Sequence, residues 1–242
     1  MRITILGSGD AFGSGGRFNT CFHMETGGKQ LLMDCGASSM IAMRRYGVDP
    51  NAIDGILITH LHGDHFGGLP FFLLYEQFES ERDRPLTLAG PPGLWERTKE
   101  AVRVFFCGVD LEWRFPIDVI ELQPGKSDDV LGLSVEPFPV VHGPPNCYAL
   151  RVGDGERVFT YSGDTAWTDT LVDAARDADL FIMECYAPAG ENERHSDWET
   201  LQKQLPRVSA RRILLTHMNE DMLARRGEIP LETLEDGMVL DV

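Results

Sequence analysis

The chain has 242 residues, of which 43% are hydrophobic and 25% are charged, as in ordinary folded proteins. This composition excludes a disordered chain, a collagen-like repeat and a coiled coil. Its 22 basic and 38 acidic residues give a net charge of −16, which argues against binding of extended nucleic acid. A small anionic substrate can still be drawn to a local cationic site.

Short apolar runs bounded by turn residues predict strands along the whole chain. The strands are expected at 2–6, 30–34, 56–59, 86–89, 117–122, 131–138, 147–152, 157–161, 179–184 and 212–216, with a last one at 238–240. Helical spacing of apolar residues predicts helices at 38–46, 66–79, 93–106, 168–177 and 196–205. Ser196 is the expected N-cap of the last helix, because residues 196–199 have the capping-box pattern.

Three of the expected strands are almost wholly apolar, which is typical of strands buried on both faces between helix layers. They are 56–58, 180–183 and 213–215. No linker, repeat or low-complexity tract divides the chain. We therefore expect one domain over residues 1–242, an α/β sandwich with its sheets inside.

The sequence also predicts where the protein works. No apolar run approaches the ~20 residues that cross a bilayer, and residues 1–9 predict a strand instead of a signal peptide. The five cysteines are scattered and lack C-x-x-C spacing, which favours unpaired thiols in a reducing compartment. We expect a cytoplasmic protein without a membrane partner.

The segment after the strand at 56–59 carries the densest group of metal-binding side chains. His60, His62, Asp64 and His65 lie within six residues, directly after the strand. Imidazole and carboxylate are ligands that borderline divalent metals prefer. A solvated polar loop is the alternative, but it would not place these four residues at adjacent and alternating positions beside a strand.

Three more candidate ligands stand at the ends of apolar strands. They are His142, Asp164 and His217. Each by itself is compatible with a turn or a capping residue. Together they repeat the context of the first group, and α/β folds place their sites at the carboxyl ends of strands.

The chain resembles the metallo-β-lactamase fold hydrolases from about residue 2 to residue 217. The motifs that carry the resemblance are Asp34, Thr59-His60-x-His62-x-Asp64-His65, His142, Ser162-Gly163-Asp164-Thr165 and Leu215-Thr216-His217. Within that superfamily it is most similar to ribonuclease Z, a tRNA 3′-endonuclease, and to related phosphodiesterases. The closer similarity lies in Leu6-Gly7-Ser8-Gly9, Arg17-Phe18-Asn19-Thr20, Phe66-Gly67-Gly68-Leu69-Pro70 and His195-Ser196.

The resemblance implies an αββα sandwich, with two mixed sheets between helix layers, and a site for two divalent metal ions. Zinc is the expected metal, with manganese or iron as alternatives. The implied ligands are His60, His62 and His142 for one ion, Asp64, His65 and His217 for the other, and Asp164 for both. Paired ions would activate water and would attract an anion despite the negative charge of the chain. Asp64 could also orient or deprotonate that water, and Asp34 would either steer a ligand or end its strand.

His195 is the second expected catalytic residue. It precedes the helix at 196–205, and a helix N-terminus with free N–H groups binds anions. Its imidazole could bind a phosphate oxygen or donate a proton to a leaving oxygen. In the ribonuclease Z branch a histidine in a His-Ser-Thr segment serves phosphodiester cleavage, whereas this chain has His195-Ser196-Asp197.

One departure from ribonuclease Z affects the expected substrate. That branch carries a long tRNA-binding arm between the positions of His142 and Asp164, and here only 22 positions separate them. No cluster of lysines and arginines elsewhere replaces the arm. We therefore expect hydrolysis of small or cyclic phosphodiesters instead of tRNA, by an enzyme that the resemblance also allows to be a homodimer.

Three other functions compete with this hypothesis. The first is hydrolysis of a carboxylic ester, lactone, thioester or lactam, although Asp164 stands where the best-known lactamases of this fold use cysteine. The second is a redox di-iron protein, which would usually carry glutamate in place of His62. The third is a non-catalytic binding module, which would require that ligands had been lost.

Overall fold

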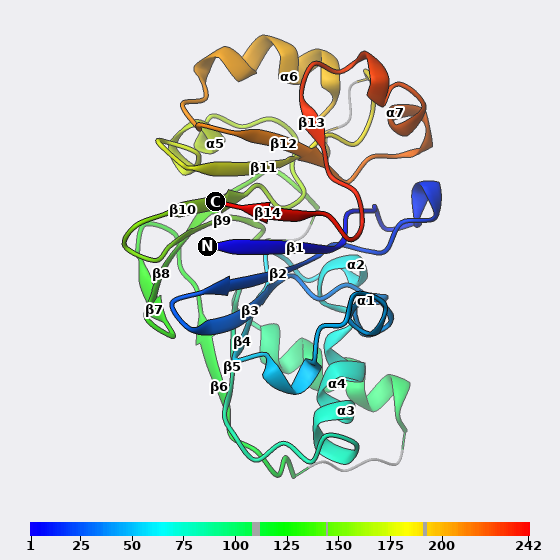
Figure 1. Cartoon of the computed structure of the whole chain (residues 1–242), viewed down its shortest axis with the longest axis vertical. Coiled ribbons are helices and arrows are strands. Elements are labelled where there is room, and N and C mark those ends of the chain that lie inside the picture. The colour runs from blue at the N-terminus through cyan, green and yellow to red at the C-terminus, as the bar shows by residue number, and fades with distance from the viewer. Residues whose placement is uncertain (108–111, 144, 191–192) are drawn as a thin grey trace.

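Two β-sheets lie face to face between two layers of helices in the computed structural model, which describes residues 1–107, 112–143, 145–190 and 193–242 (Figure 1). Among these residues each sheet has seven strands, in the orders β14-β1-β2-β3-β4-β5-β6 and β13-β12-β11-β10-β9-β8-β7. The first sheet comprises β1 (Arg2–Gly7), β2 (Cys21–Thr26), β3 (Lys29–Met33), β4 (Gly55–Leu57), β5 (Leu86–Gly90), β6 (Ile117–Glu121) and β14 (Val239–Asp241). The second comprises β7 (Asp128–Val130), β8 (Leu133–Pro139), β9 (Tyr148–Gly153), β10 (Val158–Tyr161), β11 (Leu180–Glu184), β12 (Ile213–Thr216) and β13 (Glu232–Thr233).

Both sheets are mixed. Strands β3 to β6 are parallel neighbours, as are β10 to β13, and the remaining described pairs are antiparallel. The parallel strands bring their carboxyl ends to one edge of the sandwich, where α/β folds place their sites.

Helices cover the outer face of each sheet. The first sheet is covered by α1 (Ser39–Tyr46), α3 (Leu69–Phe78) and α4 (Leu94–Phe105), and the second by α5 (Thr170–Ala174), α6 (Trp198–Gln204) and α7 (Glu220–Ala224). The short α2 (Gly63–Phe66) follows β4. The structure also has 3₁₀ helices at Ser14–Gly16, Pro50–Ala52, Leu205–Arg207 and Arg226–Glu228. None of the helices in the described part of the chain has the length and apolarity that crossing a membrane requires.

Three apolar clusters hold the layers together. The central cluster joins side chains of both sheets, for example Ile5 and Phe22 with Phe159 and Leu214. The other two clusters join one sheet to its own helices, as Phe72 of α3 does for the first sheet. Apolar burial on both faces explains why the inner strands are almost wholly hydrophobic. The predicted αββα sandwich with two mixed sheets is confirmed.

Several predicted elements differ from the observed ones. The expected helix at 66–79 begins only at Leu69, as α3, because the chain first turns at Gly67 and Gly68 to pass another backbone segment. A Cβ on Gly68 would lie 2.4 Å from the Gly36 carbonyl oxygen, so only glycine fits there. The expected helix at 168–177 is shorter and spans only Thr170–Ala174.

Among the described strands and α-helices, five were not predicted: β2, β7, β13, α2 and α7. Strand β2 lies in the middle of the first sheet, yet His23 and Glu25 interrupt its apolar run. The ring of His23 is buried, and its Nε2 lies 3.0 Å from Gln30 Oε1 on the neighbouring β3. A hydrogen bond between strands therefore gives the buried Nε2 of His23 a partner, while its Nδ1 has none among the described residues.

Candidate dinuclear metal site

All seven predicted metal ligands lie in segments that follow strands. His60 and His62 come after β4, and α2 then carries Asp64 and His65. His142 follows β8, Asp164 follows β10 and His217 follows β12. His217 has a φ of 59°. Its backbone N–H donates to the carbonyl oxygen of Ser8, the residue after β1, at 3.2 Å. The two sheets thus deliver side chains to one place from opposite sides.

The first cluster consists of three histidines whose ring nitrogens converge. His62 Nδ1 lies 3.1 Å from His60 Nε2 and 3.0 Å from His142 Nε2. Burial lowers the pKa of His60 well below its usual value and that of His142 to about 4, so both rings are neutral at pH 7. Three nitrogens around a tetrahedral zinc, at bonds of about 2.0–2.1 Å, would stand about 3.3 Å apart. The cluster therefore fits a metal ion.

The second cluster combines two carboxylates with two histidines. His65 Nε2 lies 3.3 Å from Asp64 Oδ2 and 3.2 Å from Asp164 Oδ1, and His217 Nε2 lies 3.3 Å from each of these carboxylates. The buried atoms His65 Nε2 and Asp164 Oδ1 have no hydrogen-bond partner among the described residues. Buried polar atoms without partners are costly unless an ion satisfies them. This set of atoms also fits a divalent metal.

Asp164 links the two clusters. Its Oδ2 lies 3.3 Å from His217 Nε2 and 3.8 Å from His142 Nε2. Burial acts to raise the pKa of Asp164, but His217 and His65 outweigh it and hold that pKa below the usual range. An ionised carboxylate between two clusters can share its oxygens between two cations.

Asp34 orients His65 by contacting the ring nitrogen that faces away from the second cluster. His65 Nδ1 donates to Asp34 Oδ2 at 2.6 Å, and the Thr59 N–H donates to Asp34 Oδ1 at 2.8 Å. With its proton on Nδ1, the His65 ring turns the lone pair of Nε2 into the second cluster. Asp34 is thus both a strand-end residue, at a φ of 59°, and the partner of a candidate ligand.

Glu184 is a buried carboxylate at the site that the sequence reasoning missed. It ends β11, contacts His195 Nδ1 and lies 3.6 Å from His217 Nδ1. The Thr165 N–H donates to Glu184 Oε2 at 2.6 Å. Burial, followed by the charge of Asp164, raises the pKa of Glu184 well above its usual value. A glutamate that ends an otherwise apolar strand was the signal available in the sequence.

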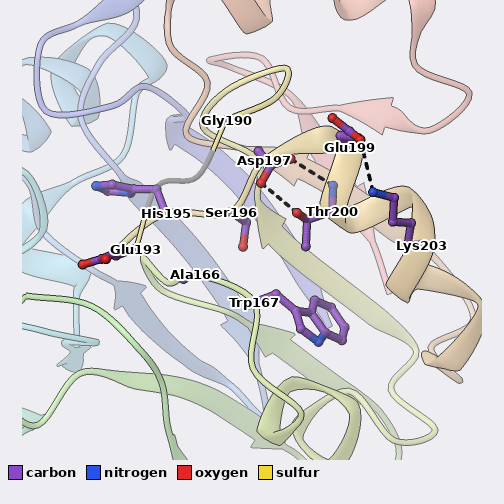
Figure 2. Close-up of a pocket in the computed structure, with 10 residues that line it drawn as sticks. All are labelled: Ala166, Trp167, Gly190, Glu193, His195, Ser196, Asp197, Glu199, Thr200 and Lys203. Atoms are coloured by element: carbon purple, nitrogen blue, oxygen red, sulfur yellow. Dashed lines mark hydrogen bonds and ion pairs between the residues drawn. The ribbon is translucent and has the colours of Figure 1, made fainter.

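His195 lies beside the two clusters, as predicted. Its ring centroid is 4.8 Å from that of His142, and it stacks on Tyr186 at 4.7 Å. His195 also lines a hollow together with Trp167 and Thr200, and its ring extends away from these two side chains (Figure 2). Burial lowers the pKa of His195.

The predicted N-cap and the anion site at the helix N-terminus are wrong. The N-cap of α6 is Asp197, whose Oδ1 accepts from the Thr200 N–H at 2.9 Å (Figure 2). The Ser196 hydroxyl donates to the Thr165 carbonyl at 2.7 Å, and the Ser196 N–H donates to Glu184. These protein acceptors take the donors that a bound anion would need.

Comparison with known proteins agrees with this geometry. A family model described as "Anti-Pycsar protein Apyc1" matches residues 1–234. The ribonuclease Z of Methanothermobacter thermautotrophicus is 26% identical over 96% of this chain and 90% of that protein. The probable metallo-hydrolase YhfI of Bacillus subtilis is 25% identical over 90% of this chain and 87% of that protein.

Solved structures give the same result for the fold. The short form of human tRNase Z has a TM-score of 0.80 and 26% identity, with 100% of this chain and 99% of that chain covered. A diphosphatase of the PhnP family has a TM-score of 0.79 and 19% identity, with 100% and 97% covered. The predicted resemblance to metallo-β-lactamase fold hydrolases of the ribonuclease Z branch is confirmed.

Proposed function

Because this chain belongs to the Anti-Pycsar protein Apyc1 family and is a metal-dependent hydrolase, we propose that it hydrolyses small or cyclic phosphodiesters at a dinuclear site. The observation that carries the proposal is the pair of clusters that Asp164 links: it belongs to the second, and its Oδ2 lies 3.8 Å from His142 Nε2 of the first. The Glu184–His195 pair lies beside them. Two cation sites fit a centre that gathers negative charge in its transition state.

The proposed ligands of the first ion are His60, His62 and His142, and those of the second are Asp64, His65 and His217, with Asp164 shared. Bound divalent ions supply activation of water and neutralisation of charge on the phosphoryl oxygens. Mixed imidazole and carboxylate donors support zinc as the metal, with manganese or iron as alternatives.

The protein side chains have separate tasks in this proposal. Asp64 Oδ2 lies 3.3 Å from His217 Nε2 in the second cluster, and the Asp64 carboxylate orients the attacking water and takes up its proton. Glu184 engages His195 Nδ1 and leaves Nε2 to meet a phosphate oxygen or to protonate the leaving oxygen. The stacked ring of Tyr186 holds the His195 imidazole in place.

The chain offers little support for tRNA as the substrate. Between His142 and Asp164 the described residues form the β9–β10 pair, which is joined by a short turn. The net charge of −16 also opposes binding to a long phosphate backbone. We therefore propose a small anionic substrate and no partnership with extended nucleic acid or with a membrane.

Three further proposals concern the protein as a whole. A single domain over residues 1–242 is supported by the central apolar cluster, which joins both sheets. A cytoplasmic location is supported by the cysteines, since none of them forms a disulfide bond in the described part of the chain. A homodimer is supported by exposed apolar side chains on α3 and α4, such as Phe71 and Phe105, and its test is sedimentation of the purified protein.

A substrate panel tests the proposed function. The purified protein is stripped with a chelator, reloaded with Zn²⁺, Mn²⁺ or Fe²⁺, and assayed on bis(4-nitrophenyl) phosphate, nucleoside cyclic monophosphates, a lactone, a thioester and a β-lactam. We expect turnover of phosphodiesters that requires metal and disappears in Asp164→Ala. Turnover of a lactone or thioester without turnover of any phosphodiester would replace this function with the carboxylic ester alternative.

A further inference from the structure

The backbone of His217 has a conformation that histidine rarely takes. Its φ of 59° lies in the left-handed region, which is unfavourable for a residue with a Cβ. In this conformation His217 Nε2 lies 3.3 Å from Asp64 Oδ2 and 3.3 Å from Asp164 Oδ2. A strained residue of this kind persists only where its surroundings hold it. The contacts of the His217 backbone therefore bear on the geometry of the second cluster.

The ring of His217 has less support than the ring of the other histidine in the second cluster. His65 Nδ1 lies 2.6 Å from Asp34 Oδ2, which is a short hydrogen bond. His217 Nδ1 lies 3.6 Å from Glu184 Oε1 and has no hydrogen-bond partner among the described residues. The position of His217 Nε2 therefore depends more on the backbone that carries the ring.

Ser8, the residue after β1, holds that backbone in place. Its carbonyl oxygen accepts from the His217 N–H at 3.2 Å and from the Thr216 hydroxyl at 3.2 Å. The residues that follow in the two segments, Gly9 and Met218, form a parallel bridge. Ser8 is completely buried, so water does not compete for these bonds. A shift of the Ser8 backbone would therefore move the His217 backbone with it.

Asp236 in turn holds Ser8. It lies in the segment that crosses from β13 of the second sheet to β14 of the first (Figure 1). Its Oδ1 accepts from the N–H and from the hydroxyl of Ser8, each at 2.8 Å, and its Oδ2 accepts from the Phe18 N–H at 2.8 Å. Hydrogen bonds to a carboxylate are stronger than those to a neutral acceptor. Both oxygens of Asp236 are thus used to fix the chain on either side of the turn after β1.

The surroundings of Asp236 require a carboxylate. Three donors point at its two oxygens, and Arg17 Nη1 approaches the same place, with contacts of 3.3 Å to the Ser8 hydroxyl and 2.7 Å to the Leu234 carbonyl. An asparagine amide offers one oxygen and one NH₂ group. If that oxygen accepts from Ser8, the NH₂ group meets the Phe18 N–H, and two donors face each other. Asp236→Asn should therefore disturb Ser8 with almost no change in side-chain size.

We propose that Asp236 is a positioning residue of the second cluster and acts through the Ser8 carbonyl on the backbone of His217. The inference rests on the dinuclear site of the proposed function and adds a residue that is not among its seven proposed ligands. His217 is a proposed ligand of the second ion alone. Loss of the Asp236 carboxylate should therefore weaken the second ion and spare the first.

Metal titration of the full-length protein, one cluster at a time, tests the proposal. His62→Ala removes a ligand of the first cluster only, and Asp64→Ala removes a ligand of the second cluster only. Each variant is stripped with a chelator and titrated with Zn²⁺ in competition with a chromophoric chelator. We expect Asp236→Asn to raise the Kd about tenfold in the His62→Ala background, as loss of an outer partner of a metal ligand does. In the Asp64→Ala background it should leave the Kd unchanged.

Glu235→Gln is the matched control, because it removes a charge from the adjacent residue, whose exposed carboxylate contacts Arg226. It should leave both Kd values unchanged. Circular dichroism at the titration temperature shows whether each variant is folded, and Asp236→Glu, which displaces the carboxylate, replaces Asp236→Asn if that variant unfolds. Equal weakening at both clusters, as a general loss of stability would cause, overturns the proposal, and so does no weakening at the second. If the unmodified protein binds no Zn²⁺, it is the proposed function itself that fails.

Discussion

His65 Nδ1 lies 2.6 Å from Asp34 Oδ2, and both side chains are completely buried. The bond connects the end of β3 to α2 and fixes the face that His65 presents to the second cluster. Burial acts to raise the pKa of Asp34, and the His65 contact opposes it. Outer partners of this kind decide how well a ligand is oriented.

Asp34→Asn should therefore weaken metal binding without unfolding the protein. The amide of this variant can turn its nitrogen toward His65, and it then no longer keeps the proton of His65 on Nδ1. The lone pair of Nε2 is then less available to a metal, so we expect metal affinity to fall about 10–100-fold. Metal titration after chelation measures this. Asp54→Asn is the matched control, because Asp54 is a carboxylate that binds Arg84 at 2.6 Å and lies outside both clusters. Equal affinities for the two variants would contradict the role of Asp34.

Glu184→Gln should lower turnover while the metal content stays the same. Glu184 contacts His195 Nδ1 and is not among the seven proposed ligands, so its loss disturbs proton transfer more than metal binding. General acid catalysis contributes about 10²–10⁴-fold, and we expect kcat to fall within that range.

The double variant Glu184→Gln/His195→Ala tests whether the two residues act together or independently in proton transfer. Residues that act as a unit are strongly non-additive, so the double variant should be about as slow as His195→Ala alone. Steady-state kinetics of the three variants give the coupling. Multiplicative losses would mean that Glu184 acts apart from His195.

Removal of metal should lower thermal stability as well as activity. The second cluster buries Asp64 and Asp164 with His65 and His217, and its unpartnered atoms lose the ion that would satisfy them. A ligand present at about 100 times its Kd stabilises the folded state by about 2.7 kcal/mol. For a chain of this size that corresponds to a rise in Tm of about 5–10 °C. Calorimetry with and without chelator measures the shift, and identical curves would argue against metal at the clusters.

Gly68→Ala should destabilise the fold near the site. The new Cβ would lie 2.4 Å from the Gly36 carbonyl oxygen and 2.8 Å from that of Cys35, and backbone atoms cannot move aside cheaply. We expect a loss of about 1–3 kcal/mol in the free energy of unfolding, as in other overpacked positions. Gly227→Ala is the control, because a Cβ there meets no atom within 4 Å. Urea titration compares them, and equal midpoints would contradict the close approach at Gly68.

Local patterns carried most of the prediction for the fold and for the ligands. The almost wholly apolar strands predicted sheets that lie between layers of helices. A strand that is buried on both faces has no polar residues at alternate positions. His60, His62, Asp64 and His65 were identifiable because four residues that can bind metal lie within one segment of six residues. His142, Asp164 and His217 could be added because each follows an apolar strand.

Long-range neighbours decided the remaining features. In the sequence Glu184 is an ordinary residue at the end of a strand, and it reaches His217 only because β11 pairs with β12. The N-cap of α6 is Asp197 instead of Ser196, because Ser196 forms hydrogen bonds with Thr165 and Glu184. A hollow that His62 helps to line exists because β5 pairs with β4 and carries α4 to the site. Sequence alone determined which side chains can bind metal, since that is a property of residue type and local spacing. Only the tertiary structure decided which groups orient them and which surface surrounds them, because these depend on the order of strands far apart in the chain.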